Sequence, residues 1–161
     1  MEHQTTRPAD WMEDTLEQNG DRLLRLAIAI LGSTAEAEDT VQDVFVKLVE
    51  KCPDFESSEH ETAWLTRVTI NLCRDRLRSQ WWKKRAPLLE TYPARDEEET
   101  NVLESVSALP SRYRTVIHLL YFEGYTIREI AEISGQTEST VRKQHSRAKK
   151  MLREAIGSEA T

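Results

Sequence analysis

Apolar residues recur at steps of three and four along most of this chain, and one acidic, proline-containing stretch interrupts the pattern. Such spacing places side chains on one face of an α-helix, whereas a half-buried strand alternates at every second residue. Glycine and proline number five each, too few for the many tight turns of an all-β protein. The interruption holds Pro87, Pro93 and the run Asp96-Glu-Glu-Glu99. The sequence therefore predicts an all-α protein of two small helical domains joined by a flexible acidic linker.

Glycine, proline and hydroxyl residues mark where the helices begin and end. We expect helices over about 21–31, 35–51 and 61–84, with Gly32 after the first, Ser33 and Thr34 as caps of the second, and Pro53 beyond its end. Further helices are expected from Pro110 to Glu123, over 127–133, and over 138–156, separated by Gly124 and Gly135. The predicted organisation is a tail at 1–14, domains at 15–85 and 102–157, a linker at 86–101, and a tail at 158–161.

Charge is distributed unevenly along the chain. The net charge is −6 and the isoelectric point is near 5.3, which by themselves argue against nucleic-acid binding. However, residues 57–85 hold seven basic and three acidic side chains, and residues 139–153 hold six basic side chains and no acid. Two basic stripes in acidic surroundings predict local contacts with phosphates and little affinity for DNA elsewhere.

The segment 125–143 has the pattern of a helix-turn-helix. Ile127, Ile130 and Ala131 fall on the inward face of the first helix, and Ala131 is small enough for a second helix to cross closely. Gly135 can adopt the positive φ of the turn, and Thr137 can cap the helix that follows. In that helix the residues expected to face the core are Val141, Ala148 and Leu152.

The opposite face of the second helix is basic and hydroxyl-bearing. Its N-terminal residues would enter the major groove, and those further along would meet phosphates. The alternative is a basic face that is merely solvated. The candidate residues are Ser139, Arg142, Lys143, Ser146, Arg147 and Lys150. His145 lies on the inward side, and we interpret it as a packed histidine because no cysteine or carboxylate cluster accompanies it.

Two further segments of the first domain carry chemical information. In 37–45, Val41, Val44 and Phe45 point inward and leave an exposed acidic and amide-bearing face, which taken alone is an ordinary solvated surface. In 64–85, tryptophans alternate with arginines, a combination that suits unstacked bases and their backbone, although Trp64 could instead be a core residue. Trp81 and Trp82 are adjacent and project about 100° apart on a helix, so we do not expect both to be fully buried.

Taken together, the strings A-E-D-x-V-Q-x-V-F at 37–45 and W-L-x-x-V-x-x-N-x-x-x-D-x-x-R at 64–78, followed by the helix-turn-helix, resemble regions two and four of bacterial sigma factors. Their order and separation are similar to the extracytoplasmic-function (ECF) group of the sigma-70 family. The resemblance covers about residues 15–84 and 100–156. It implies a non-enzymatic subunit that binds core RNA polymerase and directs initiation at chosen promoters.

The resemblance also implies a role for each surface. Docking on the β′ clamp helices falls to Glu38, Asp39, Gln42, Asp43 and Phe45. Binding of the minus-ten element and its non-template single strand falls to the 54–61 loop and to Trp64, Arg67, Asn71, Arg74, Arg78, Lys83, Lys84 and Arg85. The basic face of the last helix would read the minus-thirty-five duplex.

An unidentified apolar surface would meet the β flap, and an anti-sigma factor is an expected partner. Lys143, Gln144 and His145 depart from the family's usual pattern, so sequence preference does not transfer.

Several other classes of protein fit poorly. No apolar run approaches the roughly 20 residues of a membrane span, and residues 1–4 do not resemble a secretory signal. Cys52 and Cys73 lack metal-site spacing, and we expect two reduced, buried thiols in a bacterial cytoplasmic, nucleoid-associated protein without a metal or cofactor. A free-standing helix-turn-helix regulator explains 126–153 but assigns no role to 37–45 or 64–85. A small metal or cofactor enzyme lacks its ligand clusters and phosphate-binding glycines.

Overall fold

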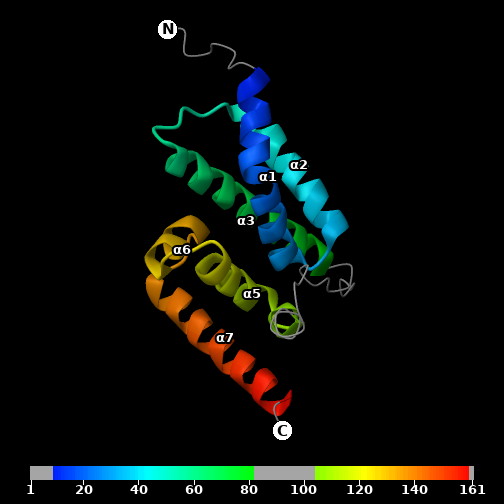
Figure 1. Ribbon diagram of the computed structural model, residues 1–161, viewed down its shortest axis with the longest axis vertical. Coiled ribbons are helices and arrows are strands. Elements are labelled where there is room, and N and C mark those ends of the chain that lie inside the picture. The colour runs from blue at the N-terminus through cyan, green and yellow to red at the C-terminus, as the bar shows by residue number, and fades with distance from the viewer. Residues whose placement is uncertain (1–8, 82–103, 160–161) are drawn as a thin grey trace.

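The computed structural model describes residues 9–81 and 104–159, and the helices in these ranges form two packed units (Figure 1). The first unit contains α1 (Ala9–Leu31), α2 (Thr34–Lys51) and α3 (Ser58–Trp81). The second contains α5 (Ser111–Ile117), the π-helical turn η1 (His118–Phe122), α6 (Ile127–Ser134) and α7 (Glu138–Glu159). The described ranges contain no strand, which confirms the all-α prediction. The predicted linker at 86–101 lies outside the described residues.

The break between α1 and α2 lies at the glycine and serine that the sequence analysis identified as helix-ending and helix-capping residues. Gly32 has φ +72° and donates its N–H to the Ile28 carbonyl at 2.7 Å. Ser33 then accepts a hydrogen bond from the Glu36 N–H at 3.3 Å, which confirms it as the cap of α2. At the other end Cys52 takes a left-handed conformation with φ 40°. This position lies beyond the buried stripe of α2, so Cys52 is exposed and the expectation that it is buried was wrong.

The helix α1 begins at Ala9 rather than near Asp21, and α3 begins at Ser58 rather than near Glu61. Contacts between these helices account for the extra turns. Thr15 is buried and donates to the Glu61 carboxylate at 3.1 Å. Trp11 and Met12 of these early turns also pack against the core, so tertiary contacts stabilise this part of α1.

The predicted helix from Pro110 to Glu123 is divided in two. Its first part is α5, and in its second part the Glu123 N–H bonds to the His118 carbonyl five residues earlier, at 3.1 Å. Gly124, with φ +74°, then ends the segment as expected. Insertions of this kind into helices are frequent at functional sites. The wide turn leaves Tyr121 and Phe122 exposed.

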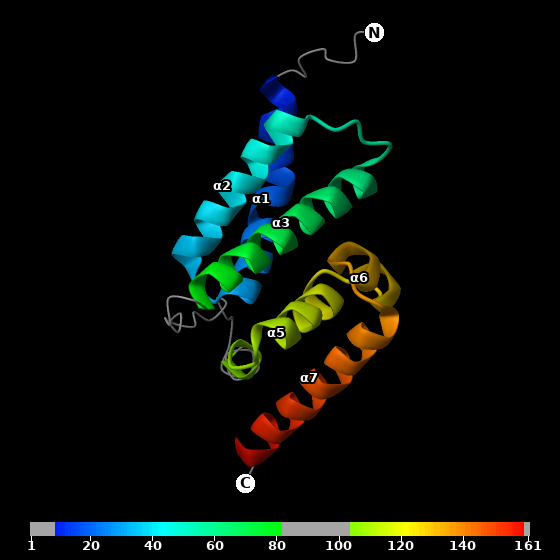
Figure 2. The same cartoon turned by 180° about the vertical axis from the view of Figure 1, so that it is seen from behind.

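One hydrophobic core extends through both units. Buried residues of α1 and α3 belong to the same cluster as buried residues of α5, η1, α6 and α7. Figures 1 and 2 show α5 between the three-helix unit and α7, and α1 contacts α5 while α3 contacts α6. Each fully buried leucine or isoleucine stabilises the fold by about 1.5–3 kcal/mol relative to exposure. The members include Leu23, Leu26, Ile70, Leu119 and Ile130.

Candidate nucleic-acid interface

The geometry of α6 and α7 is that of a helix-turn-helix. Thr126 and Glu129 form a reciprocal capping box at the start of α6, with contacts of 3.1 and 3.2 Å. Gly135 has φ +68° in the turn, and Thr137 accepts from the Thr140 N–H at 3.1 Å. The turn and the cap are confirmed. Our reading of the sequence missed the capping box, although Thr-x-x-Glu ahead of an apolar run is its usual signal.

The basic face of α7 is open to solvent. Val141 and Ala148 are fully buried and Leu152 packs against a second small core, so the opposite side of the helix faces outward. Every candidate for the minus-thirty-five element is exposed: Ser139, Arg142, Lys143, Ser146, Arg147 and Lys150. Arg142 pairs with Glu138 at 3.2 Å, an exposed contact that contributes little energy and can yield to DNA.

His145 is half-buried, as the sequence predicted, and its Nε2 lies 2.9 Å from the Tyr121 hydroxyl. This contact ties α7 to the π-helical turn. Burial and the positive charge of Lys149 lower the pKa of His145, which favours a neutral ring in the basic helix. Within the described ranges there is no group of three or more histidine, cysteine, aspartate or glutamate residues that could hold a metal ion.

The helix α3 carries the minus-ten candidates on a single face. Trp64, Arg67, Asn71, Arg74 and Arg78 recur at alternating steps of three and four, which align them along the helix. Arg67, Asn71 and Arg78 are exposed, whereas Trp64 is half-buried beside the core and its ring lies 5.8 Å from that of Phe55. Trp64 therefore packs partly against the core, and its contact with DNA stays a prediction. Lys83, Lys84 and Arg85 lie outside the described residues.

Arg74 differs from its neighbours on this face. It is half-buried, and its Nη1 donates to the Ser134 carbonyl of the second unit at 2.7 Å. Desolvation, with a smaller contribution from Arg78, lowers the pKa of Arg74, although an arginine stays charged at any physiological pH. The residue that sequence reasoning assigned to DNA thus has a protein partner in this arrangement.

The acidic candidates on α2 also lie on one accessible face. Glu38, Asp39 and Gln42 are exposed, and Asp43 is exposed but pairs with Arg76 of α3 at 2.9 Å. Phe45 is half-buried behind them and packs against the core, as predicted.

Beside this face, α1 and α2 form an open apolar groove that sequence reasoning missed. Its volume is about 540 Å³. Leu16, Val46 and Val49 line it and are 52%, 52% and 59% exposed. An exposed apolar groove rimmed by acidic side chains is typical of a protein-binding surface. Glu13 and Glu50 lie at this groove and give it that acidic edge.

A second apolar groove lies where α7 passes α5 and the π-helical turn. It has a volume of about 410 Å³ and is lined by Ile117, Tyr121, Leu152 and Ile156, with Lys149 and Arg153 at its edge. The sequence did not locate this surface, because Ile117 and Tyr121 come from a different element than Leu152 and Ile156.

The two cysteines lie in different environments. Cys73 is buried and desolvation raises the pKa of its thiol to about 12, whereas Cys52 is exposed. A thiol with a raised pKa is a poor nucleophile, so the buried one is unreactive. Within the described ranges, no helix has the length and apolar character needed to cross a membrane.

An all-α fold that contains a helix-turn-helix, with arginines along one face of α3 and of α7, has the features of a nucleic-acid-binding protein. The family model "Sigma-70 region 2" matches residues 15–83, and "Sigma-70, region 4" matches residues 99–152. The chain therefore belongs to the ECF group of the sigma-70 family, whose members are transcription initiation factors.

Curated relatives support this membership. The RNA polymerase sigma factor SigV of Bacillus subtilis is 31% identical over 135 residues, which cover 80% of this chain and 81% of SigV. The ECF RNA polymerase sigma factor SigM of Mycobacterium tuberculosis is 29% identical over 141 residues, covering 84% of this chain and 72% of SigM.

Two solved structures share the fold. The sigma factor RpoE of Bartonella quintana, crystallised with the anti-sigma factor NepR, superposes with a TM-score of 0.77 at 23% identity, over 93% of this chain and 98% of that one. CnrH, in complex with the cytosolic domain of CnrY, gives a TM-score of 0.67 at 23% identity, over 94% and 90% of the two chains.

Proposed function

We propose that this chain binds core RNA polymerase and directs it to promoters, with the second unit reading the minus-thirty-five duplex and the first unit capturing the minus-ten single strand. The observation that carries the proposal is the occurrence, in one sigma-70 family chain, of two separate helical faces suited to DNA, the aromatic and arginine face of α3 and the basic face of α7. A regulator that acts without polymerase needs only α7.

Each face suits a different form of DNA. The exposed face of α7 projects from a helix-turn-helix, a geometry that fits the major groove, where arginine can contact the edge of guanine. The half-buried Trp64 and the arginines that follow along α3 suit stacked bases and the phosphates between them. In this mechanism the energy of strand capture offsets the unpairing of the promoter. The chain makes and breaks no covalent bond and needs no cofactor.

Docking on polymerase is assigned to two surfaces. The acidic face of α2, with Glu38, Asp39 and Gln42, and the adjacent apolar groove would receive the β′ clamp helices. Asp43 would join them on release from Arg76. The groove formed by Ile117, Tyr121 and Leu152 is our candidate for the β flap, because it is apolar and lies away from the basic face of α7. Such a protein acts on the bacterial nucleoid in the cytoplasm.

An anti-sigma factor is part of the proposal. RpoE and CnrH, which share the fold, were crystallised with NepR and with the cytosolic domain of CnrY. If this chain has such a partner, affinity purification of the tagged chain from its own cells will retain a second protein besides polymerase. Adding that protein to a transcription reaction will then suppress initiation, and a retained protein without this effect contradicts the assignment.

The test of the proposed function is transcription in vitro with purified bacterial core polymerase on a pool of genomic promoter fragments, with and without the chain. New, discrete start sites that require the chain are expected, and the aligned sequences upstream will give both promoter elements. Asp39→Arg should abolish these starts, whereas Asp21→Arg, also exposed but on α1, should not. Duplex binding by the chain alone without polymerase-dependent starts would instead support a free-standing regulator.

A further inference from the structure

Two of the three residues of α7 that depart from the family's usual pattern are turned away from its exposed face. Gln144 and His145 are half-buried, whereas Arg142, Lys143 and Ser146 on either side of them are exposed. Each of the two inward side chains makes a hydrogen bond within the second unit. These bonds join α7 to two different elements, the turn that precedes it and the π-helical turn η1.

Gln144 is held by the turn of the helix-turn-helix. Its Nε2 donates to Gln136 Oε1 at 2.8 Å. Gln136 is itself fixed twice, because its N–H donates to the Ala131 carbonyl at 3.0 Å and its Nε2 donates to the Ser134 hydroxyl at 3.1 Å. A continuous chain of hydrogen bonds therefore runs from the end of α6, through the turn, to the second turn of α7.

His145 is held by the π-helical turn. Its Nε2 lies 2.9 Å from the Tyr121 hydroxyl, and the centroids of the two rings are 5.8 Å apart. Burial, with a smaller contribution from Lys149, lowers the pKa of His145 and so favours the neutral ring, in which one nitrogen can accept a hydrogen bond. Adjacent residues of a helix project about 100° apart, so the bonds of Gln144 and His145 restrain α7 from two directions.

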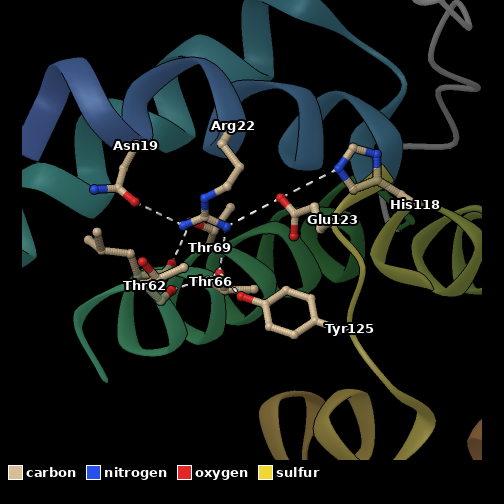
Figure 3. Close-up of polar contacts among 9 residues, drawn as sticks. Asn19, Arg22, Thr62, Thr66, Thr69, His118, Glu123 and Tyr125 are labelled. Carbon is tan, nitrogen blue, oxygen red and sulfur yellow. Dashed lines mark hydrogen bonds and ion pairs between the residues drawn. The ribbon is translucent and has the colours of Figure 1, made fainter. Parts of the chain in front are cut away.

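The π-helical turn is itself anchored at both of its ends. His118 begins the turn and Glu123 follows it, and their side chains are 2% and 4% exposed. His118 Nε2 lies 3.7 Å from Glu123 Oε1 (Figure 3), and the Glu123 N–H donates to the His118 carbonyl at 3.1 Å. Arg22 of α1 adds a contact of 3.3 Å with the same carboxylate. Tyr121 therefore projects from a fixed turn, although the residue itself is 62% exposed.

These bonds restrain a motion that the apolar contacts of α7 oppose only weakly. Val141 and Ala148 are fully buried, but their side chains are small and apolar packing is not directional. A rotation of α7 by about 20° about its axis would move a side-chain tip about 6 Å from that axis by about 2 Å. The usual spread of hydrogen-bond lengths is only about 0.5 Å. The rotation of α7 therefore decides which base edges Arg142 and Lys143 can reach.

We propose that Gln144 and His145 are positioning residues, and that the Gln144–Gln136 and His145–Tyr121 bonds set the rotation of α7 and thereby the base pairs that its exposed face prefers. The inference rests on the proposed function, since it concerns duplex recognition by that face. It assigns no direct contact with DNA to either residue.

The test measures base preference rather than total activity. Each base pair of a mapped minus-thirty-five element is varied in turn, and transcripts from the pooled templates are counted with core polymerase and the unaltered chain or a variant. Relative output among the templates reports base preference. A variant with less total activity, for instance through the groove assigned to the β flap, is therefore still informative.

The first pair of variants removes the bond to the turn with uncharged side chains of similar length. Gln144→Met and Gln136→Met should each lower the preference for the best base about five-fold, the factor to which one typical hydrogen bond corresponds. The loss should occur at two or more base pairs, and the double variant should lose no more than one single variant. Gln18→Met, at an exposed site of α1, is the matched control and should keep the original preference.

The second pair of variants removes the bond to the π-helical turn. Tyr121→Phe deletes one exposed hydroxyl, which should leave folding intact, and His145→Phe keeps a ring at its position. Each should change the preference at several base pairs, and the double variant should again add nothing. His145→Gln should restore the original preference, because its amide nitrogen can take the place of Nε2 opposite the Tyr121 hydroxyl.

Two results would overturn the proposal. A change confined to one base pair in Gln144→Met, with additive losses when Gln136→Met is combined with it, would mean that Gln144 contacts DNA directly. Base preferences that none of the four variants alters would mean that neither bond positions α7.

Failure of this inference is distinguishable from failure of the proposed function. Starts that require the unaltered chain, with preferences that no variant changes, reject the positioning role and retain the sigma role. The absence of starts from every template with the unaltered chain rejects the proposed function, and this inference with it.

Discussion

The two helices that we assign to DNA, α3 and α7, have similar local chemistry but different surroundings. Both carry arginines on one face and buried apolar residues on the other. On α7 the whole candidate face is exposed, whereas on α3 Arg74 binds the Ser134 carbonyl and Arg67 lines the same hollow as two carboxylates of α6. The difference shows that a helical face can have the chemistry for binding DNA and still be partly covered by other parts of the chain. Availability depends on what the rest of the chain packs against that face.

The largest effect is expected from breaking the core that both units share. Ile130 is 1% exposed and belongs to the cluster that includes Leu23 and Ile70. Ile130→Ala should lower the free energy of unfolding by roughly 2–5 kcal/mol. Urea unfolding followed by circular dichroism should remain a single transition, and Val49→Ala at an exposed site should change it little. Two separate transitions, only one of them shifted, would show that the units fold independently.

The next effect concerns Arg114, which donates to the Ala29 and Ile30 carbonyls at the end of α1 and so caps that helix and joins the units. Arg114→Met should destabilise the chain by about 3 kcal/mol, because buried carbonyls lose a charged donor. Arg112→Met is the matched control, since Arg112 is exposed and its guanidinium lies over the Tyr113 ring at 4.7 Å. Its effect should stay within about 0.5 kcal/mol. If urea titrations showed the same loss of stability for both variants, Arg114 would not have a particular role in joining the units.

The contrast between α3 and α7 can be sharpened by one substitution in each. Arg142→Ala should weaken binding of the free chain to a duplex carrying the mapped minus-thirty-five element by about 1–3 kcal/mol. Arg67→Ala should leave that affinity unchanged, yet it should reduce open-complex formation with core polymerase. Fluorescence anisotropy and permanganate footprinting measure the two effects. Loss of duplex affinity in Arg67→Ala would mean that α3 also contacts duplex DNA in the free chain.

The smallest effects at neutral pH are expected at the thiols. The exposed Cys52 should react rapidly with a disulfide reagent at pH 8, whereas the buried Cys73 should react only when the chain unfolds. The folded pKa of Cys73 is about 12 against 9.0 for an ordinary thiol, so its contribution to stability is constant below pH 9. Above pH 9 the unfolded thiol loses its proton first, and stability falls as the pH rises towards 12. A Cys73→Ala variant, compared by urea unfolding, should lack this part of the pH dependence.

Much of the helical framework follows from short-range signals. Gly32, Ser33, Gly124, Gly135 and Thr137 all act where the sequence placed them, because caps and positive-φ turns depend only on nearby residues. The early start of α1 and the π-helical turn at 118–122 were not predicted, since both depend on packing. Cys52 was expected to be buried and is exposed, because it lies beyond the end of the stripe that buries its neighbours. The assignments of individual residues to DNA and polymerase stay predictions.

The sequence by itself determined the helices, the family and the two basic faces, since periodicity, caps and charge are local properties of the chain. Only the tertiary structure decided which face is covered. The Arg114 cap on α1 and the Arg22–Glu123 pair join residues 84 and 101 positions apart. No pattern in a single sequence encodes such pairs, because their energy depends on the burial and dielectric surroundings that exist only after the units have packed.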